Sequence, residues 1–237
     1  IVDRYQQALV MVKEATSSSS GEMRIGFLGT ACQGFLSEFV SEFISSHPDI
    51  KLSLNCGNID SLTTQLSEGK SDIGVITYIN KDFQTGFESL EINRFRLFLI
   101  THPNHVFSRR DYISLSDLSG YPAVNFSAMT NPIASDYNRQ LFKKSNSKYN
   151  VVSEITSIEE GIFFTSINQG FFILPEYLLM YVPETLCKVP IIDEHAYITL
   201  NLIWKKQNDN PAISPFVNEF RIYMKNHYNN TIDTKKD

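Results

Sequence analysis

The sequence predicts an α/β protein of two lobes, each with a mostly parallel sheet covered by helices. Over residues 23–76, stretches typical of strands and of helices alternate in the order β-α-β-α-β. A second series of the same kind follows over residues 95–203. The 237 residues also exceed the roughly 100–150 of a common domain, which allows one large domain or two lobes.

The first twenty residues predict a helix and a tether. Apolar residues recur there at spacings of three, four and three, the pattern of a helix that meets another helix: Val2, Tyr5, Leu9 and Val12. Four serines and a glycine over residues 17–21 then predict a flexible connector. Two heptads do not separate a coiled coil from a single amphipathic helix, so both interpretations stay open.

The first lobe is predicted over residues 21–94, completed by residues 204–228. Three stretches are apolar or alternate with period two, as strands do: 23–28, 50–56 and 72–76. A helix is expected from Phe35 until Pro48 ends it. Asp60 is expected to cap a second helix, and Gly69 to end it in the left-handed conformation.

The second lobe is predicted over residues 95–203. Its expected strands share the same apolar patterns: 95–101, 122–126, 151–155, 171–174 and 198–203. Asn131 and Pro132 predict a helix start, and a capping box from Ser157 to Glu160 predicts another. Ser214 is expected to cap the last helix, which should fray from Lys225 into a disordered tail over 229–237.

Composition excludes several classes of protein. The net charge of −5 argues against this chain being a nucleic-acid-binding domain, because such domains carry a basic stripe on their surface. Three scattered cysteines, Cys32, Cys56 and Cys187, do not make a disulfide framework. No apolar run approaches the ~20 residues of a membrane span.

Catalysis is not expected, because no complete catalytic constellation is present. Gly29 and Gly34 have the spacing of a phosphate loop, but Phe35 stands where its lysine must be. His102 and His105 lack a Cys or carboxylate partner at ligand spacing, which favours a polar turn. Cys32 has no identifiable base, and Glu159 with Glu160 suits helix capping. No metal and no cofactor are therefore predicted.

Six segments together resemble the effector-binding region of LysR-type transcriptional regulators. The family patterns are "L-R-I-G", "F-x-x-x-x-P-D-I/V", "L-x-x-G-x-L-D-x-A-I", a strand ending in His-Pro, "I/V-S-L-x-D-L" and "G-L-G-I-A-L-L-P". They correspond here to residues 23–26, 43–50, 66–76, 97–103, 113–118 and 168–175. Ser71 and Gly74 depart from the third pattern, and Asn168 replaces the first glycine of the last. Asn tolerates the left-handed conformation best after Gly, so this last change is mild.

The resemblance implies a type 2 periplasmic-binding-protein fold. Two Rossmann-like subdomains would be joined by two crossover strands, near residues 94–99 and 200–204, with a small-molecule cleft between them. The helix at 1–16 would be the end of a linker helix that pairs subunits in a homodimer or tetramer. A DNA-binding winged helix-turn-helix would precede Ile1 and be absent from this chain. DNA would be a partner only through that part, and RNA polymerase would be a further partner. The protein would lie in the cytoplasm and would not bind membranes.

Ligands in open α/β sheets sit where parallel strands end and helices begin. The predicted contacts are therefore polar and aromatic residues at or just after the ends of three strands: Thr30, Cys32, Gln33, Thr77, Tyr78, Asn125, Phe126, Ser127 and Thr130. They carry hydroxyls and amides but no arginine clamp, which suits a neutral polar metabolite or an anion held by N–H groups. Each position also fits a cap or a turn former.

Two alternatives remain at this point. The same fold serves stand-alone solute-binding proteins of transporters. An N-terminal helix with an a/d seam would have no use in such a monomeric receptor. An enzyme on this fold would need an ionisable pair in the cleft, and the predicted loops contain none. The sequence does not identify the effector, nor whether it activates or represses.

Overall fold

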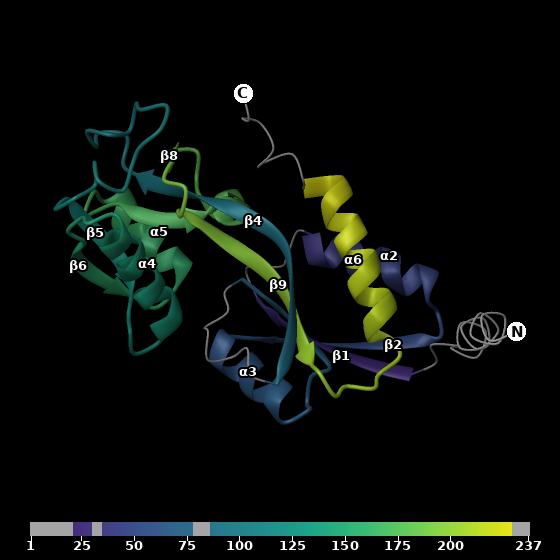
Figure 1. The fold of residues 1–237 in the computed structure, drawn as a ribbon. Helices are drawn as coiled ribbons and strands as arrows, with labels where there is room; N and C mark the ends of the chain where they lie inside the picture. Colours follow the sequence, from purple (N-terminus) through teal and green to yellow (C-terminus); the bar gives the residue numbers. More distant parts are fainter. Residues whose placement is uncertain (1–20, 30–34, 78–85, 229–237) are drawn as a thin grey trace, which may run out of the picture. The chain divides into compact units, whose positions relative to one another are not determined.

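The computed structural model describes residues 21–29, 35–77 and 86–228. The described chain forms two compact units: unit 1 runs to Asn93 and resumes at Thr199, and unit 2 is Arg94–Ile198. Strands β4 (Phe87–Thr101) and β9 (Tyr197–Lys205) are sheet neighbours, and each begins in one unit and ends in the other (Figure 1). Both predicted crossovers are therefore confirmed as strands, longer than expected. The helix predicted over 1–16 lies outside the described residues.

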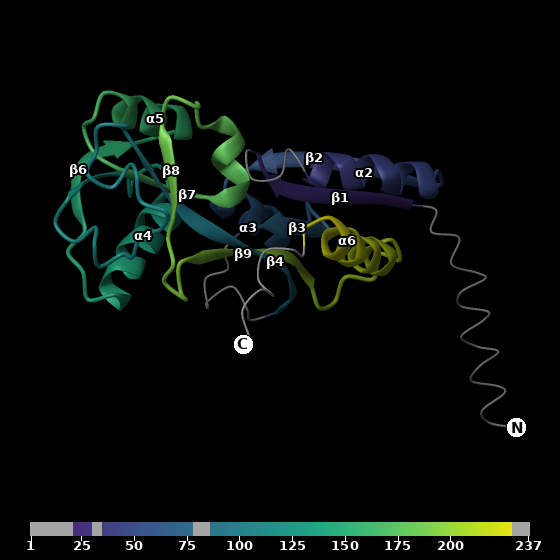
Figure 2. The same cartoon turned by 90° about the horizontal axis from the view of Figure 1, so that it is seen from above.

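The sheet of unit 1 has the predicted parallel centre. β1 (Gly21–Leu28) pairs in parallel with β2 (Ile50–Gly57) on one side and with β3 (Ile73–Ile76) on the other (Figure 2). β3 then pairs antiparallel with β9. The connections from β1 to β2 and from β2 to β3 each contain a helix, which is how parallel strands of one sheet are joined.

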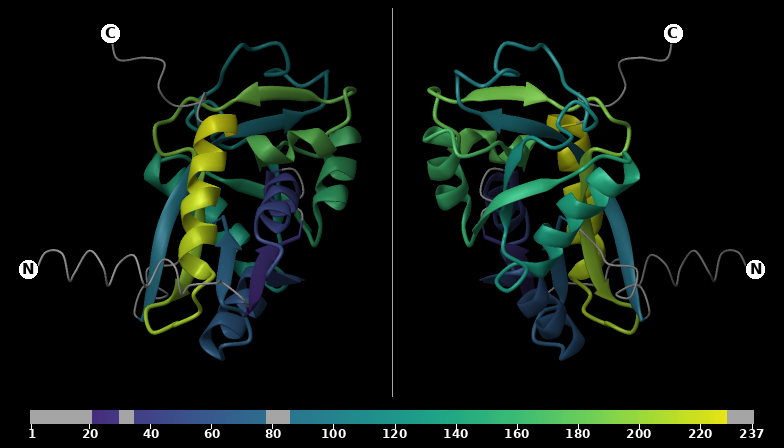
Figure 3. Two further views of the ribbon diagram at one scale, coloured as in Figure 1. Left: turned by 90° about the vertical axis from the view of Figure 1, so that its right-hand side faces the viewer. Right: turned by 90° about the vertical axis from the view of Figure 1, so that its left-hand side faces the viewer.

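Helices cover both faces of this sheet. Figures 1 and 3 show α2 (Phe35–Ser46) and α6 (Ile213–Tyr228) on one side, and α3 (Ile59–Ser67) on the other. α2 and α6 join through buried rings: the Phe39 centroid lies 5.1 Å from that of Phe216 and 4.8 Å from that of Phe220. Edge-to-face and tilted ring pairs of this kind stabilise the packing beyond the burial of apolar area.

Glycines let α3 approach the sheet closely. A Cβ on Gly26 would lie 2.9 Å from Leu62 Cδ2, and one on Gly74 would lie 2.8 Å from Leu66 Cδ1. Leu62 and Leu66 are 0% and 1% exposed. Gly74, which departs from the family pattern by lacking a methyl group, thus leaves room for the Leu66 side chain.

Three predicted helix boundaries were wrong. Asn58, not Asp60, caps α3: its Oδ1 accepts the N–H of Ser61 at 2.8 Å, because the helix begins at Ile59. Ser214 lies inside α6. The turn that leads into the helix is formed before it, where the backbone oxygen of Asn210 accepts the N–H of Ile213. α6 also continues to Tyr228, past the expected fraying point.

The packing of Tyr228 explains why α6 does not end at Lys225. The Tyr228 ring centroid lies 6.0 Å from that of Phe35 and 6.4 Å from that of Tyr223. These contacts come from another helix and from the preceding turn, so the periodicity of the sequence alone did not reveal them. The predicted tail over 229–237 lies outside the described residues.

In unit 2, β5 (Pro122–Phe126) and β6 (Asn150–Ile155) are parallel, as predicted. β5 is bridged in parallel to Phe171, next to β7 (Phe172–Pro175). β7 pairs antiparallel with β4, and so does β8 (Cys187–Pro190). β8 was not predicted, since its four residues contain one buried apolar side chain, Val189.

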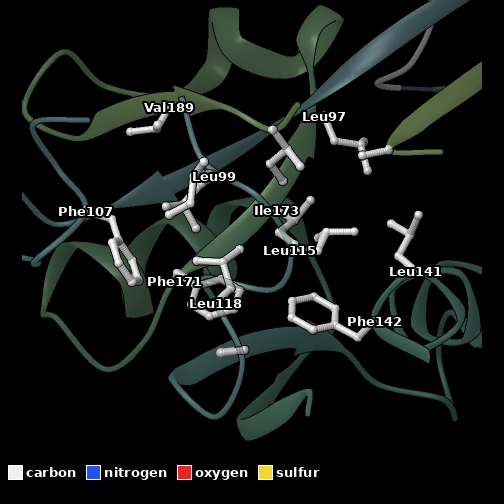
Figure 4. Close-up of a cluster of buried hydrophobic side chains, with 14 residues drawn as sticks. Leu97, Leu99, Phe107, Leu115, Leu118, Leu141, Phe142, Phe171, Ile173 and Val189 are labelled. Carbon is white, nitrogen blue, oxygen red and sulfur yellow. The ribbon is translucent and has the colours of Figure 1, made fainter. Parts of the chain in front are cut away.

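Alternate residues of these strands enter two separate cores. Leu97 and Leu99 of β4 enter the core that contains Leu141 and Phe142 of α4 (Pro132–Lys144), as Figure 4 shows. Ile100 enters the other core, which α5 (Ile158–Ser166) and the 3₁₀ helix η2 (Glu176–Tyr181) cover. The period of two along the strand therefore places α4 and α5 on opposite faces. η2 escaped prediction because six residues are too short to show helical periodicity.

Three helices end in the same way. The residue after the C-cap has a positive φ: +70° at Gly69 after α3, +49° at Asn146 after α4 and +60° at Asn168 after α5. In each case the N–H of this residue and the N–H of the residue after it donate to carbonyls of the last turn, as Lys70 N does to Gln65 O at 2.8 Å. This is the Schellman arrangement. The prediction that Gly69 ends α3 in the left-handed conformation is confirmed, and Asn168 adopts the same conformation, which Asn tolerates best after Gly.

Candidate functional site

In unit 1 the candidate residues follow two parallel strands that end at the same edge. The register pairs Phe27 of β1 with Val75 of β3, so β1 and β3 stop side by side. Thr77 directly follows β3 there and is 6% exposed. The predicted contacts Thr30, Cys32, Gln33 and Tyr78 lie outside the described residues.

In unit 2 the candidate residues occupy the turn from β5 into α4. Asn131 caps α4, accepting the N–H of Ala134 at 3.3 Å, and Pro132 follows it, as predicted. Ser127 shapes the turn: its N–H donates to Ile155 O at 2.8 Å, and its own backbone oxygen accepts from Asn131 N at 2.9 Å. The Ser127 hydroxyl accepts the N–H of Met129 at 3.3 Å.

Asn125 holds the end of β5 to α4. Its side chain is 0% exposed. Its Nδ2 donates to the backbone oxygen and the hydroxyl of Ser135 at 3.3 and 3.4 Å, and its Oδ1 accepts from Asn138 Nδ2 at 2.9 Å. The amide is thus satisfied inside unit 2, as buried polar groups must be. Through α4, Asn125 positions the helix start that the Ser127 turn leads into.

Sequence reasoning missed Ser135 and Asn138 as parts of this network. Both are buried, at 1% and 6% exposure. The signal was present: they stand at i and i+3 on the face of α4 that also carries Leu141 and Phe142. Polar residues on an apolar helix face need partners, and Asn125 is a partner of both.

The other two candidates of unit 2 differ in surroundings. The Phe126 ring packs against Phe172, with centroids 5.6 Å apart, and is part of the core on the α5 side. Thr130 is exposed, next to Met129, which is 94% exposed. The structure therefore brings Asn125, Phe126, Ser127 and Thr130 together at the carboxyl end of β5, with different access to solvent.

The histidine pair and Glu160, which were considered as sites of chemistry, form hydrogen bonds within a turn and a helix cap. His102 and His105 lie in a turn, where His102 Nδ1 accepts the N–H of Asn104 at 3.1 Å. Burial lowers the pKa of His105.

Glu160 belongs to a capping box as predicted, since its N–H donates to Ser157 Oγ at 3.2 Å. Its carboxylate reaches one residue further back than the standard box and accepts from Thr156 N at 2.7 Å.

Over residues 21–29, 35–77 and 86–228, no group of three or more His, Cys, Asp or Glu side chains is arranged to hold a metal ion. No described helix has the length and apolar character needed to cross a bilayer.

Comparison with known proteins places the chain in a family. The family model described as "LysR substrate binding domain" matches residues 16–225. AlsR, an HTH-type transcriptional regulator of Bacillus subtilis, is 23% identical over 220 residues, which cover 89% of this chain and 69% of AlsR. HcaR, the Hca operon transcriptional activator of Escherichia coli, is 23% identical over 229 residues, 90% of this chain and 74% of HcaR. YwbI of B. subtilis, an uncharacterized HTH-type transcriptional regulator, is 24% identical over 196 residues. The match covers 61% of YwbI's length.

Solved structures show the same fold at low sequence identity. The BenM effector-binding domain with benzoate has a TM-score of 0.78 at 17% identity, covering 86% of this chain and 92% of that one. The QuiR effector-binding domain with shikimate has a TM-score of 0.72 at 21% identity, covering 87% and 98%. Full-length CbnR with its target DNA has a TM-score of 0.74 at 18% identity, covering 94% and 80%.

These likenesses confirm the predicted fold, an α/β protein of the type 2 periplasmic-binding-like class. The family match extends over most of the 237 residues, from residue 16 to residue 225. It includes both units and the two strands that run between them. The chain therefore belongs to the LysR substrate-binding domain family, the effector-binding domain of LysR-type transcriptional regulators.

Proposed function

We propose that this chain senses a small polar or anionic metabolite and passes that signal to transcription. The observation that carries the proposal is the chemistry at the strand ends: in each unit a parallel strand ends in an uncharged hydrogen-bonding residue, Thr77 after β3 and Ser127 after β5. The turn at Ser127 leads into the N-terminus of α4, where the positive end of the helix dipole favours a negatively charged ligand.

The ligands of related structures support a carboxylate. The BenM domain was solved with benzoate and the QuiR domain with shikimate, and both compounds carry one carboxylate. Hydroxyls and backbone N–H groups hold such a group without an arginine. The proposed contacts are Thr30, Cys32, Gln33, Thr77, Tyr78, Phe126, Ser127 and Thr130, with Asn125 positioning α4.

The relatives favour a regulator over a transport receptor, because AlsR and HcaR are both named as transcriptional regulators. We propose that the protein acts as a homodimer or tetramer on DNA in the cytoplasm, with RNA polymerase a further partner. A ligand changes such an assembly only if it binds two of its conformations with different affinity. Sedimentation that finds only monomers at high concentration would contradict the assembly.

A thermal-shift screen tests ligand binding. The panel should hold carboxylates, sulfate, amino acids and sugars, and a ligand at a hundred times its dissociation constant should stabilise the protein by about 2.7 kcal/mol. Thr30→Ala and Ser127→Ala should reduce that shift. The control is Ser166→Ala on α5, because the Ser166 hydroxyl is exposed and bonds only its own helix, donating to Phe163 O at 2.7 Å.

The pattern of shifts decides the outcome. A shift that Ser127→Ala and Thr30→Ala diminish, and Ser166→Ala leaves intact, supports the site. A panel with no active compound, together with an unchanged reporter response in Thr30→Ala, contradicts it.

A further inference from the structure

Unit 2 contains an open cavity of about 510 Å³ at the carboxyl end of α4. Three basic side chains line it: Arg139, Lys143 and Lys148. α4 has 13 residues and is therefore about 20 Å long, which separates this cavity from the Ser127 turn at the other end of the helix. The cavity is thus a different place from the candidate effector site.

The positive charges in this cavity are poorly compensated. Arg139 and Lys143 are four residues apart on α4 and so lie on one face, where like charges repel. Arg139 Nη2 lies 3.6 Å from Glu154 Oε1, and both side chains are about half exposed, which makes a weak pair. Within the described part of the chain, neither Lys143 nor Lys148 forms an ion pair.

The helix dipole explains only part of this cluster. Cations are favoured in the last turn of a helix, which accounts for Lys143 and its neighbour Lys144. Lys148 stands beyond the helix, in the loop before β6, and Arg139 stands more than a turn before the helix end. Their convergence on one cavity is a tertiary feature that helix stability does not require.

The backbone around the cavity is held in place. Lys148 N donates to Ser119 Oγ at 2.9 Å, and Lys148 O accepts from Gly120 N at 2.9 Å. At the helix end, Lys143 O accepts from Asn146 N at 3.1 Å, so that carbonyl is already paired and repels an anion less. Tyr149, also in the lining, stacks on Phe142 with ring centroids 4.3 Å apart.

We propose that this cavity binds the phosphate group of a small organic phosphate. Three cations and one weakly paired carboxylate leave about two positive charges, and the negative end of the α4 dipole offsets about half a charge. The remainder is close to the −1.5 to −2 of a phosphate monoester near neutral pH. Arg139 offers a fork of N–H donors and the lysines offer point charges, both suited to phosphate oxygens. The volume is that of a small-molecule site, and Tyr149 offers apolar surface to the organic part.

Calorimetric titration of the protein with phenyl phosphate tests the proposal. Saturable binding that weakens with salt is expected, because the contacts are ionic. Lys143→Ala and Lys148→Ala should each weaken binding roughly tenfold, the effect of losing one charge-assisted hydrogen bond. Lys144→Ala is the matched control: it removes the same charge from the same helix turn, but Lys144 is not in the lining, so affinity should stay within about twofold.

Three results would overturn the proposal. The first is no saturable binding at millimolar phenyl phosphate. The second is equal weakening by Lys144→Ala, which would indicate diffuse attraction to a basic surface. The third is weakening by Ser127→Ala with no effect of the cavity lysines, which would place the anion at the candidate effector site. Unchanged melting temperatures of the lysine variants without ligand would show that the fold is intact in these comparisons.

Discussion

Arg24 of β1 and Asp72, just before β3, are joined by three hydrogen bonds onto one carboxylate. Arg24 N and Nε donate to Asp72 Oδ2 at 2.8 and 3.1 Å, and Nη2 donates to Oδ1 at 2.9 Å. Asn208 Nδ2 adds a bond to the backbone oxygen of Asp72 at 3.2 Å. The Asp72 side chain is 7% exposed, against 39% for Arg24. The two residues come from separate family patterns, and the fold makes them one interaction.

Asp72→Ala should destabilise the protein by about 2–3 kcal/mol, because three N–H donors of Arg24 would lose a buried, charged acceptor. Urea unfolding at neutral pH measures this. Glu68→Gln is the control, since the Glu68 carboxylate lies 2.6 Å from Lys70 Nζ in an exposed pair, and its loss should cost no more than about 0.5 kcal/mol. Equal effects of the two changes would contradict the argument.

The Asp72 contribution should depend on pH. Burial alone would raise the pKa of Asp72, but the hydrogen bonds and charge of Arg24 outweigh it and hold that pKa below its usual value. A carboxyl with a lowered folded pKa stabilises the protein above its unfolded pKa of about 3.9, and this stability is lost as pH falls through the folded value. The stability difference between the wild type and Asp72→Asn should therefore shrink below about pH 4. A gap that stays constant down to lower pH would contradict this assignment.

Gly170→Ala should destabilise unit 2 by about 1–3 kcal/mol. A Cβ there would lie 2.8 Å from the backbone oxygen of Pro122. That oxygen is held in place, because it accepts the N–H of Phe171 at 3.0 Å. Gly21→Ala is the control, because no heavy atom lies within 4 Å of its Cβ position. Chemical unfolding of both variants should separate them; a Gly170→Ala protein as stable as Gly21→Ala would be inconsistent with the close approach.

Asn168→Ala should cost about 1 kcal/mol, whereas Asn168→Gly should be neutral or stabilising. The residue has a φ of +60°, which Gly adopts freely, Asn tolerates and Ala resists. Thermal unfolding of the two variants measures the difference. Asn146, with a φ of +49°, should show the same order, and a reversed order at both positions would refute the explanation.

Thr101→Val should stabilise the protein by up to about 1 kcal/mol. Thr101 is 0% exposed, and its hydroxyl has no hydrogen-bond partner in the described part of the chain, so Val removes an unsatisfied buried group. Thr165→Val is the matched opposite: Thr165 is also 0% exposed, but its hydroxyl donates to Gly161 O at 2.9 Å. Unfolding measurements should give changes of opposite sign; a loss of stability in Thr101→Val would show that its hydroxyl has a partner.

Local patterns predicted much of this fold correctly. The strands β1, β2 and β3, the start of α4 at Asn131 and the left-handed Gly69 depend on residues near one another in the chain. The parallel order of the three strands follows from their alternation with helices. Strand periodicity and capping chemistry act over a few residues, so the sequence shows them directly. The predicted boundaries failed where a distant partner decided them, as at Tyr228, which packs on Phe35.

The candidate site divides in the same way. The amino-acid order was sufficient to place Thr77 and Ser127 at strand ends, because a strand end and a helix cap are local events. The Asn125 network, the Arg24–Asp72 bonds and the convergence of Arg139 and Lys148 on one cavity each join segments that the chain separates. Such contacts form only when packed elements bring their side chains within a few ångströms, and hydrogen bonds and ion pairs act only at that range.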